Sequence, residues 1–435
     1  MTWQERLERA APWLAAVLLV GTLTLSYVGK AVCIAEEAGF WGITRYCYSD
    51  VRVLWSFRGF DVDALPYAGA PPGYVEDYPI EYPPGLAFGA HAIALATETR
   101  RSFFNLHALT FAVAAAVAMW QLDRALRGMG LRRTRLLGFA LSPALVLFGM
   151  LNWDLWPVAL VAGGLAAAVR RRPVLAGVLF GLGAAVKWWP ALLVPLLLVG
   201  LWAPEERADA EGGTYRGDRF NPAFAAAGAW ALVQIPALVI SPSGWWAAIT
   251  FHLQRPPNLD SAYAAISTLG NYLWPSGFWV GPPDDQFLRL TYTELTTWLT
   301  IGLMAIGLVH VYRRLERGDL RPGNAALALI ALFLLTGKVF SPQFVLWLLP
   351  VAVVATVPWT SILAVEFTNA LVWALYGPWM GHINDPRYGG FLHASQGMTV
   401  LRSAMLVWVV VAALSARHEQ ADDEQQDARY AGAPA

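Results

Sequence analysis

Residues 155–186 read LWPVALVAGGLAAAVRRRPVLAGVLFGLGAAV, two apolar runs joined by three arginines. Runs of about 20 mostly apolar residues recur from position 12 to position 405, and each is long enough to cross ~30 Å of hydrocarbon. Hydrophobic residues make up 57% of the chain and charged residues 14%, which excludes an ordinary soluble protein. Because backbone groups inside a membrane must pair with one another, the sequence predicts an all-α polytopic membrane protein.

We expect one integral-membrane domain that covers residues 1–415 and contains about twelve transmembrane helices. The expected spans are 12–28, 103–122, 136–151, 155–169, 173–186, 189–202, 222–240, 293–312, 324–337, 344–357, 360–378 and 399–415. Residues 84–97 are apolar but too short to span, so they lie along the membrane interface or dip in and return. Two long polar intervals, 31–101 and 241–291, are expected to be outer loops that carry interfacial helices. Residues 416–435 are expected to form a cytoplasmic, disordered tail.

Clusters of arginine indicate the orientation of the chain. They lie in three short connections, at residues 124–135, 170–172 and 313–321. Cytoplasmic loops of membrane proteins carry an excess of basic residues, so these connections and both termini are expected in the cytoplasm. The 28 arginines against three lysines are typical of a high-GC bacterial genome, which points to a bacterial plasma membrane. The net charge of zero argues against a nucleic-acid partner.

All three lysines lie at expected outer boundaries of spans. We expect Lys30 to extend toward the lipid headgroups. Lys187 and Lys338 differ from it because each follows an apolar run and precedes a turn that contains proline. An ammonium group at that depth needs an anion, and phosphate is the natural candidate.

The two cysteines, Cys33 and Cys47, both lie in the first outer interval. An oxidising compartment permits a disulfide between them. Two buried free thiols fit the sequence as well, because pairing depends on distances that a sequence does not give.

Six short motifs follow one another along the chain on the expected outer face. They are Ser49-Asp50, Glu81-Tyr82-Pro83-Pro84, Asn152-Trp153-Asp154, Gly183-Ala184-Ala185-Val186-Lys187, the segment 251–261 with Arg255 and Asp260-Ser261, and Ser341-Pro342-Gln343-Phe344-Val345-Leu346-Trp347. In these motifs and their order the chain resembles the GT-C class of integral-membrane glycosyltransferases. Within that class it resembles glycosyltransferase family 87, which includes bacterial polyprenyl-phosphate-mannose-dependent mannosyltransferases. The resemblance covers most of the chain up to about residue 350.

The resemblance implies a GT-C-like helical bundle that moves a sugar from a polyprenyl-phosphate donor to an acceptor on the outer face, without a sugar nucleotide. It also implies that the aspartate of the first outer loop, Asp50, is the general base. The sugar, mannose or arabinose, stays open. The choice between a glycolipid and a glycan acceptor stays open too, because the last spans match nothing in the family pattern.

The residue types on the outer face fit this chemistry. Glycosyl transfer needs a carboxylate to take the proton of the acceptor hydroxyl, and cations to stabilise the leaving phosphate. We assign the first role to Asp50, which follows Tyr48, and the second to Lys187, Arg255 and Lys338. The alternative for Asp50 is a solvated loop aspartate.

The remaining candidate substrate-binding residues are Glu81, Tyr82, Asp154 and Gln343. The segment 81–84 is alternatively no more than a rigid turn, because its two prolines restrict the backbone. Asp154 alternatively only caps the helix that follows it.

No cofactor is expected. Asp61 and Asp63 have the spacing of a metal-binding acidic pair, but without a third ligand they are expected in a solvated loop, and a divalent metal is not favoured. His252 could contact the donor, but it is rather expected at the membrane interface among Trp245, Trp246 and Phe251. Glu366 is the one acid well inside an apolar run, with no evident partner beyond Asn369.

Two other functions fit the sequence less closely. A transporter or flippase of lipid-linked sugars would carry charged groups near the middle of the membrane and related halves, whereas no repeat is visible in this sequence and its polar motifs gather on one face. A ligase of O-antigen type would use a His or Arg pair in a late outer loop, which Arg255, His382 and Arg387 keep open.

Overall fold

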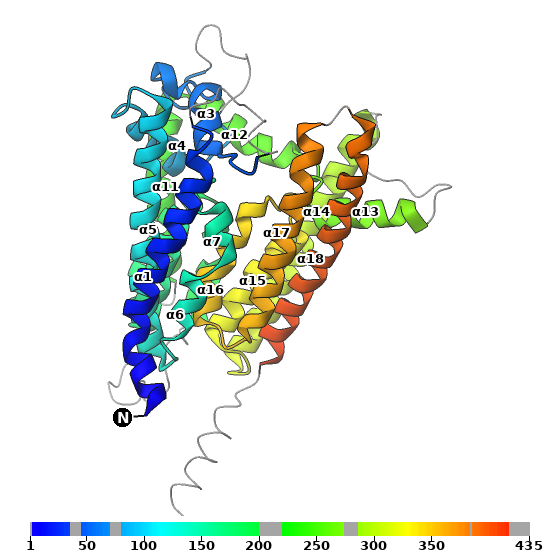
Figure 1. Ribbon diagram of the computed structural model, residues 1–435. Coiled ribbons are helices and arrows are strands. Elements are labelled where there is room, and N and C mark those ends of the chain that lie inside the picture. The colour runs from blue at the N-terminus through cyan, green and yellow to red at the C-terminus, as the bar shows by residue number, and fades with distance from the viewer. Residues whose placement is uncertain are drawn as a thin grey trace, which may run out of the picture.

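The computed structural model describes residues 2–34, 45–69, 80–199, 220–273, 286–382 and 385–416. These residues form helices and connections, with no strand among them (Figure 1). The helices are α1 (Trp3–Ala31), α3 (Asp50–Phe57), α4 (Pro84–Ala94), α5 (Arg100–Met129), α6 (Arg135–Ala140), α7 (Pro143–Phe148), α8 (Leu155–Val169), α9 (Pro173–Val186), α11 (Asn221–Ile240), α12 (Pro242–Gln254), α13 (Ala262–Leu273), α14 (Gln286–Glu316), α15 (Pro322–Thr336), α16 (Leu348–Val354), α17 (Trp359–Gly381) and α18 (Gly389–Ser415). The 3₁₀ helices are η1 (Phe60–Val62), η2 (Trp189–Val199), η3 (Pro342–Trp347) and η4 (Pro386–Tyr388).

Five helices in the described residues are long and apolar enough to cross a membrane: α1, α5, α11, the Tyr292–Glu316 part of α14, and α18. The predicted all-α membrane protein is thereby confirmed. The other apolar helices are shorter. The expected span 136–151, for example, is divided into α6 and α7, because Pro143 has no N–H with which to continue α6. The count of twelve spans therefore stays a prediction.

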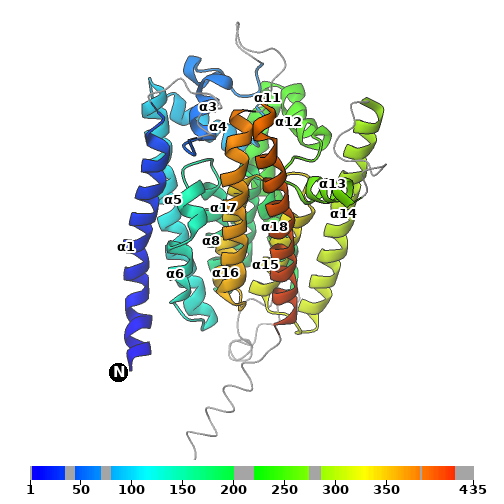
Figure 2. The same cartoon turned by 45° about the vertical axis from the view of Figure 1, so that its right-hand side comes forward.

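Both long polar intervals contain helices. The first holds α3, η1 and α4, and the second holds α12 and α13. With 11 residues, α4 is too short to cross a bilayer, as expected for this segment. In both views α3, α4 and α12 lie at the end of the bundle opposite the N-terminus of α1 (Figures 1 and 2). The expected tail beyond Ala416 lies outside the described residues.

Arginine-rich connections gather at the other end of the bundle, together with the start of α1 and the end of α18. Glu8 in α1 accepts hydrogen bonds from the Arg133 N–H (2.6 Å) and the Thr134 hydroxyl (2.9 Å) in the α5–α6 connection. Arg314, near the end of α14, donates to the Leu414 carbonyl near the end of α18. This arrangement fits the predicted orientation, while the membrane face that this end meets stays a prediction.

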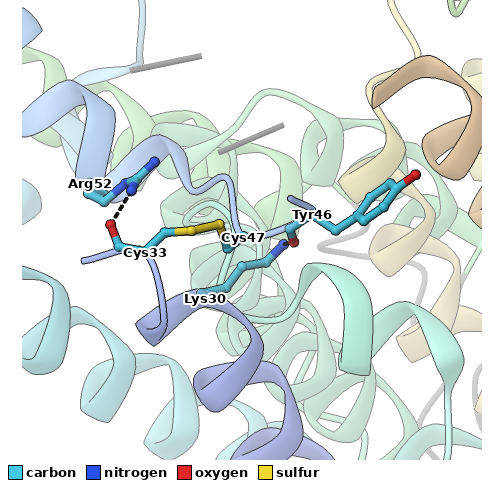
Figure 3. The surroundings of a disulfide bond; sticks show 5 residues. All are labelled: Lys30, Cys33, Tyr46, Cys47 and Arg52. Carbon is cyan, nitrogen blue, oxygen red and sulfur yellow. Dashed lines mark hydrogen bonds between the residues drawn. A yellow bond between two sulfur atoms is a disulfide. The ribbon is translucent and has the colours of Figure 1, made fainter. Parts of the chain in front are cut away.

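A disulfide joins Cys33 to Cys47 beside the end of α1 (Figure 3). Of the two alternatives for these cysteines, the disulfide is therefore the correct one. Lys30 Nζ donates to the Tyr46 carbonyl (2.9 Å), and the Arg52 guanidinium donates to the Cys33 carbonyl. Lys30 is only 3% exposed, so the prediction that it extends toward the headgroups is wrong. Its ammonium group is satisfied inside the protein by a carbonyl next to the disulfide.

Glycines allow α11 to approach α9 closely. A Cβ atom at Gly177 would lie 2.1 Å from the Pro222 carbonyl oxygen, and one at Gly181 would lie 2.2 Å from the Ala226 carbonyl oxygen. Two small residues four positions apart are typical of closely packed membrane helices. The backbones of the two helices thus meet without intervening side chains.

A third glycine brings the Glu81-Tyr82 motif to the end of α9. A Cβ atom at Gly85 would lie 2.7 Å from the Ala185 carbonyl oxygen. The start of α4 therefore abuts the last turn of α9, and Lys187 follows that turn directly. Two motifs that are about 100 residues apart in the sequence become neighbours.

Replacing Gly181 with Ala should destabilise the protein, because the added methyl group collides with backbone that cannot move aside. Overpacking of this kind costs typically ~1–3 kcal/mol. Gly228→Ala in α11 is the matched control, since nothing lies within 4 Å of the added Cβ there. Thermal unfolding in detergent should show a lower midpoint for Gly181→Ala alone, and equal midpoints would contradict this packing.

Candidate active site

A cavity of about 690 Å³ collects the motifs that the sequence singled out. The predicted site residues that line it are Asp50, Glu81, Tyr82, Lys187, Arg255, Lys338 and Gln343. Asp154 does not line the cavity but lies behind Lys187, with which it forms an ion pair. The structure therefore brings these residues together, while their roles stay predictions.

Asp50 is the first residue of α3 and is attached to the segment that precedes α8. Its N–H donates to the Leu151 carbonyl (2.8 Å). The hydroxyl of Ser49 points to the Met150 and Leu151 carbonyls (3.1 Å each) instead of capping α3. Three hydrogen bonds thus fix the place where α3 begins, and with it the carboxylate of Asp50.

Both carboxylate oxygens of Asp50 accept hydrogen bonds. The Tyr48 hydroxyl donates to one oxygen (2.7 Å) and the Asn152 amide donates to the other. Burial raises the pKa of Asp50, whereas these hydrogen bonds and the charge of Lys187 act to lower it. Burial also raises the pKa of Tyr48 and of Tyr82 well above the usual value, so both phenols stay protonated. This setting does not fit a solvated loop aspartate.

Lys187 forms the centre of a buried polar cluster. Its ammonium group donates to Asp154 Oδ1 (2.6 Å) and to Asn152 Oδ1 (3.0 Å). Trp347 Nε1 donates to the same Asp154 oxygen (2.7 Å). Asp154 precedes α8, yet its side chain makes no capping hydrogen bond, so the helix-cap alternative is wrong.

Asn152 is the member of this cluster that sequence reasoning left without a role. Its oxygen accepts from Lys187, which directs its amide nitrogen to Asp50 and to the Tyr82 hydroxyl (3.1 Å). Asn152 therefore connects the cation to the candidate base. The only signal in the sequence is its place in the same motif as Asp154.

The segment that begins at Glu81 is both a rigid turn and part of the cavity wall. Arg58 Nε donates to Glu81 Oε2 (2.9 Å), and a second nitrogen of the same guanidinium forms an ion pair with that oxygen. The Tyr67 hydroxyl donates to the Tyr82 carbonyl (2.6 Å). The two alternatives for this segment are therefore compatible, and Arg58 is a partner that no sequence pattern indicated.

His252 packs edge-on against Phe251 and also lines the cavity, so both alternatives for this residue stay open. Its Nε2 lies 2.7 Å from the Glu81 carbonyl oxygen, which can only accept, so Nε2 carries the proton. Burial lowers the pKa of His252, which favours the neutral ring. The imidazole thus links α12 to the Glu81 segment.

The two other predicted cations also line the cavity. Arg255 directly follows α12, and Lys338 follows α15 by two residues. Lys338 Nζ donates to the Leu253 carbonyl (2.9 Å) and the Thr297 hydroxyl (2.7 Å). Burial and the charge of Arg255 lower the pKa of Lys338 to about 8. Gln343, in η3, is a further lining residue.

Two remaining expectations concern acids outside this cavity, the pair Asp61 and Asp63 and the single residue Glu366. For the pair, no set of three or more His, Cys, Asp or Glu side chains within the described part of the chain is arranged to hold a metal ion. Glu366 accepts a hydrogen bond from Ser142 (2.9 Å), while Asn369 bonds the Pro342 carbonyl and Arg402 instead. Asn369 is thus not the partner of Glu366.

The family model of glycosyltransferase family 87 matches residues 81–342. The chain belongs to this family. The protein is therefore a glycosyltransferase. A search of curated proteins finds no match. The family 87 match starts after Asp50 and ends before Gln343, so the structural contacts described above, and not the match, bring these two residues into the site.

The ion pair of Lys187 and Asp154 should matter for stability in a characteristic way. Either Lys187→Met or Asp154→Asn leaves one buried group without its opposite charge, which costs about 3–5 kcal/mol. The double variant Lys187→Met/Asp154→Asn removes both charges and should lose less than the sum of the single variants. Thermal unfolding in detergent measures all three.

The exposed pair Arg387–Asp385 is the matched control, and its removal should leave the unfolding midpoint nearly unchanged. Losses that simply add in the double variant of Lys187 and Asp154 would contradict their coupling.

Proposed function

We propose that this family 87 enzyme transfers a sugar from a polyprenyl-phosphate donor to a glycolipid or glycan acceptor of the bacterial cell envelope. The observation that carries the proposal is one cavity lined by a carboxylate, Asp50, and by three cations, Lys187, Arg255 and Lys338. Its volume of about 690 Å³ falls within the range of ~300–1,000 Å³ that is usual for small-molecule sites.

In the proposed reaction the acceptor hydroxyl attacks the anomeric carbon of the donor sugar. The new C–O bond forms as the bond between that carbon and the phosphate oxygen breaks. Asp50 takes the hydroxyl proton, for which its oxygens keep lone pairs beyond those used by Tyr48 and Asn152. The polyprenyl phosphate leaves with its negative charge stabilised by Arg255, Lys338 and Lys187.

The remaining site residues divide into two groups. Glu81, Tyr82 and Gln343 line the cavity and bind hydroxyl groups of the sugar or the acceptor. Asp154 does not line the cavity and acts through Lys187, whose ammonium group it holds in place. The mechanism needs no cofactor.

The donor reaches the cavity sideways from the outer leaflet, and the acceptor reaches it from the aqueous side of the plasma membrane. Thr297, Thr300 and Ile301 of α14 support this, since they line the cavity while Ile301 is half exposed on an apolar helix. Both termini are then cytoplasmic, at the end of the bundle that carries the arginine-rich connections.

The two rival functions receive less support. A flippase would need charged groups along a path through the bundle, whereas the predicted site residues gather around one cavity. A ligase of O-antigen type would use a His or Arg pair in a late outer loop. Of its three candidates Arg255 lines the cavity, whereas His382 stacks on Tyr388 and Arg387 pairs with Asp385, and neither of these two lines it.

Membranes that contain the enzyme, incubated with radiolabelled polyprenyl-phosphate mannose or arabinose, test the proposal. We expect label to move from one of these donors into a lipid or glycan product, with no requirement for a sugar nucleotide. Label that crosses the bilayer on an unchanged donor would favour the flippase, and transfer from a sugar nucleotide alone would overturn the proposal.

The lowered pKa of Lys338 predicts a pH dependence of donor use. Below about pH 8 Lys338 is charged and attracts phosphate, and above it the ammonium group is lost. The kcat/KM for the donor should therefore fall above about pH 8, up to tenfold per pH unit for a single ionisation. In Lys338→Arg the side chain stays charged, so kcat/KM should no longer fall above about pH 8. An unchanged fall would show that another group titrates.

A further inference from the structure

Asp260 lines the cavity, and the mechanism so far does not use its carboxylate. The residue lies between α12 and α13, is 7% exposed, and lines the cavity. Its Oδ1 is buried and has no hydrogen-bond partner among the described residues. A buried polar atom without a partner is costly, so its presence in a ligand cavity indicates a contact that the ligand completes.

Buried contacts from α17 and α18 hold Asp260 in place. The Arg402 guanidinium donates to the Asp260 carbonyl and to Asn369 Oδ1 (2.6 Å). Asn369 donates in turn to the Pro342 carbonyl (2.8 Å). Arg402 is fully buried and lies 3.8 Å from the centre of the Phe340 ring. The backbone of Asp260 is therefore fixed before any ligand binds, which favours a recognition role for this residue.

The charges around Asp260 limit the kind of ligand that it can take. Arg255 and Arg402 both act on its carboxylate, so a second cation would be repelled. No further set of acidic or histidine side chains for a metal ion is present in the part of the chain described. The partner that remains is a neutral hydrogen-bond donor, and in a glycosyltransferase that donor is a sugar hydroxyl.

The position of Arg255 indicates which hydroxyl this is, on the basis of the function proposed above. The Asn258 N–H donates to the Lys338 carbonyl (2.8 Å), and the charge of Arg255 acts both on Asp260 and on Lys338, so the Asp260 segment lies beside the proposed phosphate site. In a glycosyl phosphate the anomeric carbon is flanked by the ring oxygen and by C2. The ring oxygen carries no hydrogen, so the nearest donor is the hydroxyl on C2.

We propose that the carboxylate of Asp260 accepts a hydrogen bond from the C2 hydroxyl of the donor sugar and thereby selects sugars that carry it. Hydrogen bonds to this hydroxyl strengthen as positive charge develops at the anomeric carbon. Asp260 then contributes to turnover as well as to donor choice, through direct contact with the substrate.

The test compares the polyprenyl-phosphate sugar that the wild type accepts, mannose or arabinose, with its 2-deoxy analogue. The wild type should use the 2-deoxy donor roughly 10- to 100-fold less well in kcat/KM, as expected for one hydrogen bond to a charged group. Asp260→Ala should lose a similar factor with the natural donor and should no longer distinguish the two donors. Asp260→Asn, whose amide oxygen still accepts, should keep part of the discrimination.

An analogue that lacks the hydroxyl of the terminal CH₂OH group is the control, because its effect should be the same in the wild type and in Asp260→Ala. The discrimination is a ratio within one variant and does not depend on the fraction of protein that folds. For a variant without turnover, the same ratio is taken from direct binding of the radiolabelled donors.

Full discrimination against the 2-deoxy donor in Asp260→Ala would overturn this inference and leave the proposed function intact. A wild type that transfers sugar from neither polyprenyl-phosphate donor would overturn both.

Discussion

The ion pair between Lys187 and Asp154, 2.6 Å long and buried, is the interaction on which the rest of the site depends. Two charges removed from water are stable only if their geometry is good and further hydrogen bonds satisfy them. Trp347 supplies such a bond to the carboxylate, and Asn152 accepts one from the ammonium group. The pair thereby joins the start of α8, the end of α9 and η3. Asn152 links this cluster to Asp50, because its amide group donates to the Asp50 carboxylate.

A carboxylate and cations that share one poorly hydrated cavity attract each other, and without support they would close the space that a substrate needs. Each is instead held by hydrogen bonds of its own. Asp50 is held by Tyr48 and Asn152, and Lys338 is held by a carbonyl of α12 and a hydroxyl of α14. The Cys33–Cys47 disulfide fixes the chain just before Tyr48. Arg402 fixes the backbone of Asp260.

The sequence predicts much of this arrangement because hydropathy and motif order are local properties. Apolar runs predict helices in a membrane, and polar motifs at their ends predict a shared site. Asp50, Lys187 and Lys338 from these motifs line one cavity. The partners of these residues are a different matter. Arg58, which pairs with Glu81, and Arg402, which holds Asp260, come from other segments of the chain, and no sequence pattern indicates such contacts.

The same limit explains why the prediction for Lys30 was wrong. Its partner, the Tyr46 carbonyl, is positioned next to a disulfide that the sequence left as one of two alternatives. This limit also explains the unsettled number of spans, since breaks such as the one before Pro143 depend on packing as well as hydropathy.

The central claim is that Asp50 is the general base, and the most direct measurement is the turnover of Asp50→Asn at saturating donor, side by side with Glu81→Gln, on folded protein. The asparagine keeps the size and most of the hydrogen bonding of the aspartate but cannot take a proton. Donor binding should therefore survive, while kcat should fall by about 10²-fold or more, the loss that is usual for a general base. Glu81→Gln should lose less, because Glu81 binds without taking the proton. Near-normal turnover in Asp50→Asn, with the larger loss in Glu81→Gln, would contradict the account.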